Sequence, residues 1–202
     1  MSELFSIQLQ NRQQQSRDGV WLDLPTTTEQ VQAALRQIGI SSDNPQGLFI
    51  SGYFAEEEKR FAISYNMVLA SNVDELNFLA SRLETLSTGE RAELNAALQA
   101  PQSELFSIGR ITDFPENVDY YVHLPEVHGP AQLGDYYLNR SGMVDMPEEW
   151  KGGIDTAQFG RYVAQQEQGA FTQYGYLVKS GDEWQKVHEG QSVPEEYRVT
   201  PQ

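Results

Sequence analysis

The sequence predicts an α+β fold arranged as an elongated chain of small subdomains, and three observations carry that prediction. Short segments rich in aromatic and β-branched residues occur near the start of the chain and again in its last third. Between them, leucines recur at spacings of three and four, which is typical of one helix face. The composition is lean, with 39% hydrophobic residues and a mean hydropathy of −0.53, which suits several small cores better than one large core.

The first part, residues 1–70, is expected to be a sheet with one helix packed on it. Strands are predicted at Leu4–Leu9, Val20–Leu24 and Leu48–Phe54, where apolar residues alternate or cluster between turn-rich segments. Alternation also favours a strand at Phe61–Leu69. The segment between the second and third strands has the apolar spacing of a helix, so it is the element expected to cover the sheet.

Capping boxes mark the starts of the predicted helices. Thr26 with Glu29, and Asn72 with Glu75, each place a side-chain acceptor three residues before a carboxylate. This arrangement satisfies the free N–H groups at a helix start. The second box opens a helical unit, residues 71–102, which is expected to hold two helices joined by a tight turn.

The third part, residues 103–180, is expected to form a second α+β unit that carries the dimer contact. Its best-defined stretch is predicted to be helix, break, helix and strand. Pro130 suits the first turn of one helix, and Asp155 is the predicted N-cap of the next. The aromatic and β-branched segment Phe171–Val178 is predicted to be the strand.

The last segment, residues 181–202, is expected to add a hairpin strand and then a loose tail. Gly181 and its neighbours form a predicted turn, and Trp184–Val187 is the predicted strand after it. One string, SELFSI, occurs at residues 2–7 and again at residues 103–108. A duplicated strand or a coincidence would each explain this string, and the rest of the two halves does not align.

The charge is strongly negative and is spread along the chain. There are 29 acidic and 14 basic residues, a net charge of −15, with −6 in residues 1–102 and −9 in residues 103–202. Such a surface repels nucleic acid and suits a basic partner, for example a protein that itself binds DNA. An acidic surface that serves only solubility would have the same composition.

Several classes of protein are disfavoured by what the sequence lacks. It has no cysteine, so disulfides and thiol catalysis are excluded. The N-terminal residues lack the apolar region of a signal peptide, and no apolar run approaches the roughly 20 residues that cross a bilayer. We therefore expect a cytoplasmic protein that does not contact a membrane.

No motif for catalysis or for a cofactor is present. The sequence contains no dinucleotide fingerprint, P-loop or nucleophile elbow, and carboxylates are too numerous for one catalytic pair to be singled out. His123 and His128, with Asp119 and Glu126, match no standard metal-ligand spacing, so they are expected to be structural or solvent-facing. We predict no enzyme activity, no metal and no cofactor.

Four motifs near the C-terminal end follow one another in a characteristic order. They are LGDYY at residues 133–137, PEE at 147–149, IDTAQFGR at 154–161 and GAFTQYGY at 169–176. In this order they resemble the C-terminal part of the ArdA-type antirestriction proteins. Upstream segments are similar to the family's N-terminal and central parts: Trp21–Pro25, Phe49–Tyr53 and Asp74–Ala80. At Phe61–Leu69 the resemblance implies a looser or helical segment as the alternative to a strand.

The resemblance implies an acidic protein of mobile elements that imitates DNA in shape and charge. It implies inhibition of type I restriction-modification enzymes by occupation of the DNA-binding groove, with their DNA-binding subunits as partners and without direct nucleic-acid binding. It also implies a homodimer, in which some of four aromatic residues are expected to be buried: Tyr136, Tyr137, Phe159 and Tyr174. The chain departs from the family near Gln158 and Tyr162, where acids are usual.

One alternative interpretation is an acidic adaptor that binds another basic DNA-processing protein of a mobile element. A second is an enzyme with an unrecognised carboxylate site, which the lack of any catalytic motif disfavours. For the DNA-mimic interpretation, the residues expected to contact the partner are the acidic clusters most exposed to solvent. These are Glu56, Glu57, Glu58, Asp74, Glu75, Glu84, Glu90, Glu93, Asp113, Glu116, Asp119, Glu126, Glu148, Glu149 and Asp155.

Overall fold

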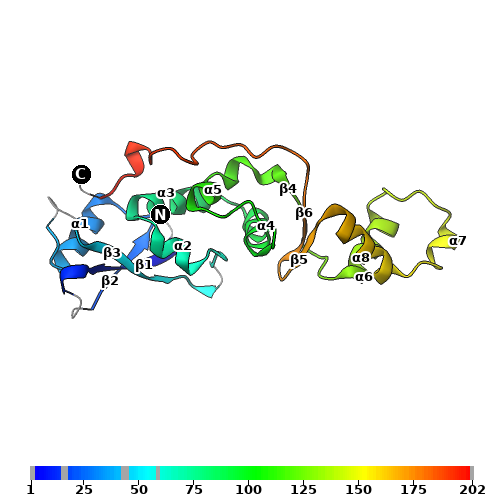
Figure 1. Ribbon diagram of the computed structural model, residues 1–202, viewed down its shortest axis with the longest axis horizontal. Coiled ribbons are helices and arrows are strands. Elements are labelled where there is room, and N and C mark those ends of the chain that lie inside the picture. Colours follow the sequence, from blue (N-terminus) through cyan, green and yellow to red (C-terminus); the bar gives the residue numbers. More distant parts are fainter. Residues whose placement is uncertain (1–2, 15–17, 42–45, 58–59, 201–202) are drawn as a thin grey trace. The chain divides into compact units, whose positions relative to one another are not determined.

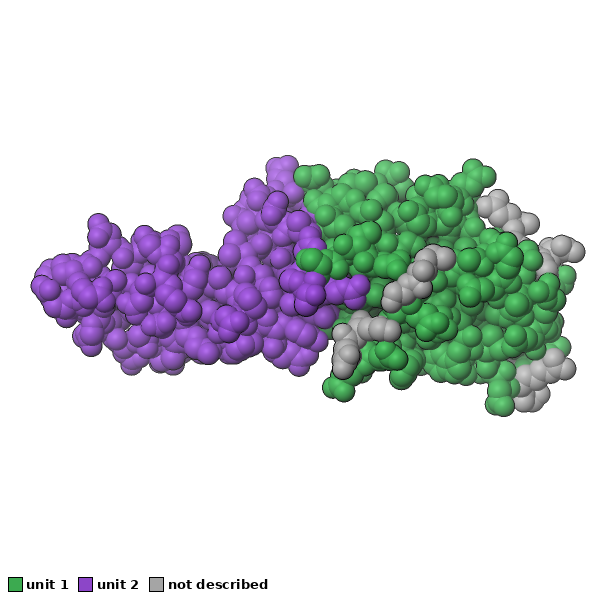
Figure 2. Space-filling view, turned by 180° about the vertical axis from the view of Figure 1, so that it is seen from behind, with its two compact units in different colours: residues 1–87, 105–116, 185–202 green, residues 88–104, 117–184 purple. Residues whose placement is uncertain are grey.

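The structure is a computed structural model that describes residues 3–14, 18–41, 46–57 and 60–200 (Figure 1). The chain forms two compact units, coloured separately in Figure 2. Unit 1 comprises residues 1–87, 105–116 and 185–202, and unit 2 comprises residues 88–104 and 117–184. Each unit contains a three-stranded antiparallel sheet and several helices, so the predicted α+β class is confirmed. The predicted boundaries at residues 70, 102 and 180 stay predictions.

Unit 1 is built on the sheet β2-β1-β3. Its elements are β1 (Phe5–Asn11), η1 (Arg12–Gln14), β2 (Val20–Leu24), α1 (Thr28–Gln37), β3 (Leu48–Phe54), α2 (Tyr65–Ala70), α3 (Val73–Glu84), α5 (Ile108–Thr112), η3 (Phe114–Glu116) and η6 (Glu195–Tyr197). Every second residue of β1 is buried, which is the alternation expected when one sheet face meets a core. Ile7 and Leu9 of β1 and Leu76 and Leu79 of α3 have no exposed surface and form the centre of that core.

The starts of α1 and α3 are fixed by capping boxes, one of them a residue later than predicted. Thr27, not Thr26, caps α1 and is paired with Gln30. Thr26 is buried, and its backbone N–H donates to Asn77 Oδ1 at 2.7 Å, so it is used in a tertiary contact. The box of Asn72 and Glu75 is confirmed at the start of α3.

The predicted strand at Phe61–Leu69 is wrong. Residues 60–64 have no regular structure, and α2 begins at Tyr65. Phe61 and Ile63 are buried, which produces the alternation seen in the sequence without a strand partner. The two copies of SELFSI also differ, because Phe5 and Ile7 lie in β1 whereas the second copy leads into the helix α5, capped by Ser107. The interpretation as a duplicated strand is therefore wrong.

The last segment of the chain is bonded to unit 1, and the predicted loose tail is wrong on this point. Asp113, which has no exposed surface, accepts hydrogen bonds from the backbone N–H groups of His188 (2.6 Å) and Glu189 (3.2 Å). Asp74 accepts from the backbone N–H groups of Val199 (2.8 Å) and Thr200 (2.9 Å). The aromatic ring of Phe78 lies against the rings of His188 and Tyr197.

Unit 2 contains the sheet β4-β6-β5. Its elements are α4 (Thr88–Gln99), η4 (Val118–Tyr120), β4 (Tyr121–Leu124), α6 (Pro130–Asp135), the π-helix η5 (Tyr136–Arg140), α7 (Glu148–Lys151), α8 (Thr156–Glu167), β5 (Ala170–Thr172) and β6 (Gly175–Lys179). The predicted roles of Pro130 in the first turn of α6 and of Asp155 as the N-cap of α8 are confirmed.

The predicted single strand at Phe171–Val178 is a hairpin. β5 and β6 pair antiparallel, with Thr172 opposite Gly175, whose φ of +118° suits glycine. The predicted strand at Trp184–Val187 is wrong, since no strand lies among residues 180–200. The partner of β6 on its other side is β4, in which Val122 lies opposite Val178.

Two glycines allow α6 and α8 to pack closely within unit 2. A Cβ atom on Gly134 would lie 1.9 Å from the carbonyl oxygen of Thr156, and one on Gly160 would lie 1.8 Å from that of Pro130. Both distances are far below van der Waals contact with rigid backbone atoms, so any side chain would separate the helices. These glycines explain the LG and FGR portions of the sequence motifs.

We expect Gly160→Ala to destabilise unit 2 by about 1–3 kcal/mol, because the added methyl group must move one helix away from the other. The measurement is urea unfolding followed by circular dichroism. Gly89→Ala is the matched control: Gly89 lies in α4 with nothing within 4 Å of an added Cβ, so stability should stay equal or rise slightly. Equal stability of the two variants would contradict the close packing of α6 on α8.

Candidate partner-binding surface

The acidic charge is divided almost equally between the two units. Unit 1 contains 16 acidic and 9 basic residues, a net charge of −7, and unit 2 contains 13 and 5, a net charge of −8. Within the described residues, unit 1 exposes nine acidic side chains and four basic ones, and unit 2 exposes eight and three. Each unit therefore presents an acidic surface by itself.

Salt bridges reduce the positive charge that these surfaces present. In unit 1, Arg82 pairs with Glu116, and Glu189 holds Arg110 at 3.0 Å. In unit 2, Lys179 Nζ lies 2.6 Å from Glu104 Oε1, and Lys151 Nζ lies 2.9 Å from Glu148 Oε2. Since these cations are already close to carboxylates of the same chain, the remaining potential of each unit is dominated by acidic side chains.

Eight of the predicted carboxylates are exposed. They are Glu56, Glu57, Glu116, Asp119, Glu126, Glu148, Glu149 and Asp155. Glu56, Glu57 and Glu116 belong to unit 1 and the other five to unit 2. Some of the eight have structural partners as well: Glu116 pairs with Arg82, Glu148 pairs with Lys151, and Asp155 accepts from the backbone N–H of Gln158 at 2.9 Å.

The other predicted carboxylates are less accessible. Asp113 is fully buried and holds the C-terminal segment, so the expectation that it faces solvent is wrong. Five are half-buried: Asp74, Glu75, Glu84, Glu90 and Glu93. Glu58 lies outside the described residues. Some carboxylates cap helices or make tertiary contacts. The sequence contains no signal that distinguishes these carboxylates from the solvent-exposed carboxylates.

Several exposed acids were missed by sequence reasoning. They are Glu3, Asp18, Asp23, Glu29, Asp145, Asp182, Glu183, Glu195 and Glu196. Most of them have no adjacent acidic residue, so no cluster marks them in the sequence. Asp23 carried a usable signal, because it follows Trp21 at the two-residue spacing that places both side chains on one face of a strand.

Glu93 of α4 differs from the other carboxylates in its environment. Burial, with the neighbouring charges of Asp119 and Glu90, raises its pKa to about 8. Among the described residues its Oε1 atom is buried and has no hydrogen-bond partner. At neutral pH this carboxyl is therefore mainly protonated and adds little negative charge to unit 2.

We expect the Glu93 carboxyl to make stability fall as the pH rises from 5 to 9. Its folded-state pKa lies above the unfolded value of 4.5, so the stabilising protonated form is fully present below pH 4.5 and is lost as the pH passes about 8. Glu93→Gln should match the parent near pH 5 and exceed it by about 1–2 kcal/mol at pH 9, after allowance for partial solvent screening. Urea unfolding at both pH values measures this, and a constant difference between the two proteins would contradict it.

His123 and two tyrosines of unit 2 have structural contacts. His123 Nε2 lies 2.7 Å from the backbone oxygen of Tyr174. Glu167 accepts hydrogen bonds from the hydroxyls of Tyr137 and Tyr176, and burial together with this carboxylate raises the pKa of both tyrosines. Within the described part of the chain, no group of three His, Asp or Glu side chains is arranged to hold a metal ion.

The fold and surface define an acidic protein with two α+β units, each of which presents an excess of exposed carboxylates. Among the described residues, no helix has the length and apolar character needed to span a bilayer. A model of the family described as antirestriction protein (ArdA) matches residues 14–178. The chain belongs to the ArdA family of antirestriction proteins. No individual curated protein matches it.

Membership implies an antirestriction function and a partner related to restriction systems. The match ends at Val178, the fourth residue of β6. The segment that completes unit 1, residues 185–202, therefore lies outside the region that defines the family.

Proposed function

We propose that the protein inhibits a type I restriction-modification enzyme by occupying the groove in which that enzyme binds DNA. The observation that carries this proposal is the net charge of −7 and −8 on the two separate units. Duplex DNA presents about one negative charge per 1.7 Å of axis along its whole length. A chain that imitates it needs carboxylates in every part, and a charge confined to one tail would not serve.

The exposed carboxylates would contact the basic residues that otherwise hold phosphates. Each such contact is weak when it is exposed to solvent, typically about 1 kcal/mol or less, so affinity arises from many contacts together. Salt screens these contacts, and the inhibition should therefore weaken as ionic strength rises. No cofactor and no turnover are required.

The test is a cleavage assay with a purified type I enzyme at a series of salt concentrations. Inhibition that is stoichiometric, reversed by added DNA and weakened by salt supports the proposal. A protein that leaves cleavage unchanged, while it binds a different basic DNA-processing protein, would instead be an acidic adaptor. Inhibition that DNA does not reverse would also exclude competition for the groove.

Two copies of the chain associate through unit 2 in this proposal. Of the four aromatics expected at the contact, Tyr136 and Tyr137 already pack against the core of their own chain, around Leu133 and Tyr176. Unit 2 exposes further large apolar side chains, with Met143 at 74%, Trp150 at 66% and Tyr162 at 60%. Exposed apolar side chains of this size favour burial against a second copy. Light scattering that gives a monomer mass at micromolar concentrations would exclude the dimer.

A further inference from the structure

One face of the unit 1 sheet carries an exposed aromatic pair. The register places Gln8 of β1 opposite Trp21 of β2 and Gly52 of β3. Two residues along, Ser6 lies opposite Asp23 and Phe54. Because side chains alternate along a strand, these residues share the face opposite to the buried β1 side chains.

The aromatic rings of this face are held in place by their neighbours and remain open to solvent. Trp21 is 51% exposed and Phe54 is 57% exposed, and their ring centroids are 6.5 Å apart at an interplanar angle of 75°. A Cβ atom on Gly52 would lie 3.1 Å from Trp21 Cη2, so the indole ring extends over the sheet toward the glycine. Two adjoining rings with half of their area in water form an apolar surface that a partner can bury.

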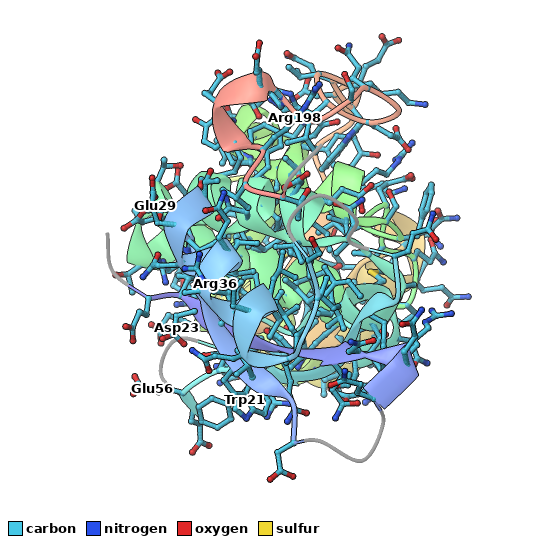
Figure 3. The ribbon with its side chains drawn as sticks, turned by 90° about the vertical axis from the view of Figure 1, so that its left-hand side faces the viewer. Trp21, Asp23, Glu29, Arg36, Glu56 and Arg198 are labelled. Carbon is cyan, nitrogen blue, oxygen red and sulfur yellow. The ribbon has the colours of Figure 1, made fainter. Side chains whose placement is uncertain are left out.

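Carboxylates border the Phe54 ring, and Trp21 packs against that ring from outside the groove. A groove of about 220 Å³ is lined by Phe54 together with Glu3, Asp23 and Glu56. Asp23 is oriented by the Ser6 hydroxyl, which donates to its Oδ1 atom at 2.6 Å. Figure 3 shows Trp21, Asp23 and Glu56 in the lower part of unit 1, with Arg198 at the top of the view. The groove thus combines an aromatic wall with acidic groups.

The chemistry that fits both features is a guanidinium group. Its planar faces stack on aromatic rings, and its N–H groups pair with carboxylates in two parallel hydrogen bonds. An ammonium group is more strongly hydrated and lacks the planar face, so it gains less from the rings. Nucleic-acid bases could stack on the rings, but the bordering carboxylates would repel the phosphates attached to those bases.

We propose that the Trp21–Phe54 face binds an arginine side chain of the basic partner surface, with the guanidinium against the rings and paired with the carboxylates of Asp23 and Glu56. The identity of the partner in this assignment rests on the proposed function. The preference for arginine rests only on the groove and its neighbouring rings. It differs from the DNA-mimic contacts in depending on uncharged aromatic groups. An anchor of this kind concentrates binding at one point of a surface whose other contacts are weak.

The first arm of the test uses peptides and needs no restriction enzyme. Binding of an arginine-rich peptide and of a lysine-rich peptide of equal length and charge is measured by calorimetry on the full chain. We expect the arginine peptide to bind at least tenfold more tightly, and Trp21→Ala to remove most of that difference. The matched control is Phe106→Ala in unit 1, which removes an exposed aromatic ring outside the groove and should retain the preference.

Equal binding of the two peptides, or a preference that survives Trp21→Ala, would overturn the assignment. Asp23→Asn provides a second variant with a smaller change in shape, and it should reduce arginine binding at least threefold. Thermal unfolding of each variant verifies that the fold is retained.

The second arm measures inhibition of the restriction enzyme. Trp21→Ala leaves the net charge unchanged, so a purely electrostatic mimic would keep its potency, whereas we expect a loss of at least tenfold. Unchanged inhibition by Trp21→Ala would exclude this face from the contact. If the parent protein prefers arginine peptides but inhibits no type I enzyme, the proposed function fails and the arginine site stands.

Discussion

A chain that ends at Trp184 is expected to lose about 3–5 kcal/mol of the stability of unit 1. Removal of residues 185–202 takes away the backbone N–H groups of His188 and Glu189. In the full chain these groups donate to the Asp113 carboxylate, which has no exposed surface. A hydrogen bond to a carboxylate contributes about 1.5–3 kcal/mol net of water, so the loss of these two bonds accounts for a change of this size. Phe78 would also lose the rings of His188 and Tyr197 that cover it. Urea unfolding monitored by circular dichroism measures the change.

Point variants separate the effect of the Asp113 hydrogen bonds from the effect of removing residues 185–202. Asp113→Ala should cost about 2–3 kcal/mol, since it leaves two backbone N–H groups without their acceptor. Glu195→Ala is the matched control, as Glu195 is exposed in the same segment and should change stability by less than about 0.5 kcal/mol. A truncated chain as stable as the full one would show that the segment does not belong to the folded unit.

Replacement of five exposed carboxylates of unit 2 by amides is expected to weaken inhibition by about 30- to 1,000-fold. The five are Asp119, Glu126, Glu148, Glu149 and Asp155. Each exposed contact contributes about 0.4–0.8 kcal/mol, so five together give about 2–4 kcal/mol. A single change such as Glu57→Gln should alter potency less than about fivefold for the same reason.

The control for this series exchanges aspartate and glutamate at four of these positions and leaves Asp155 unchanged, because Asp155 caps α8. It keeps the charge and alters only side-chain length, so a mimic that works through charge should retain most of its potency. Inhibition should fall stepwise as amides accumulate. Loss of all inhibition when one of these carboxylates alone is replaced, with the fold intact, would indicate a localised site and would favour the adaptor or an enzyme.

Local signals in the sequence were sufficient where a few neighbouring residues determine the structure. The strands β1, β2 and β3 follow from alternation, and Asn72 and Asp155 cap helices as predicted, since each bonds within three residues. Predictions were wrong where a residue far away in the sequence determines the local structure. The backbone N–H of Thr26 donates to Asn77, 51 residues away, so it is not available to a capping box, and Thr27 caps α1 instead.

For the acidic surface as well, some features could be predicted from the sequence and others depend on distant residues. Composition and the even spread of charge were visible in the sequence, but the accessibility of each carboxylate was not. Asp113 is buried because its oxygens bind backbone groups some 75 residues further along the chain. Glu93 is half-buried by the packing of α4, and its raised pKa follows from burial that no local pattern reports.

The most direct measurement is displacement of labelled DNA from the DNA-binding subunits of a type I enzyme, followed by fluorescence anisotropy. If the protein occupies the DNA groove, it should release the DNA completely, its apparent Kd should rise in proportion to DNA concentration, and its affinity should fall with increasing salt. A ternary complex of enzyme, DNA and protein, or displacement that is independent of salt, would contradict groove occupation by a DNA mimic.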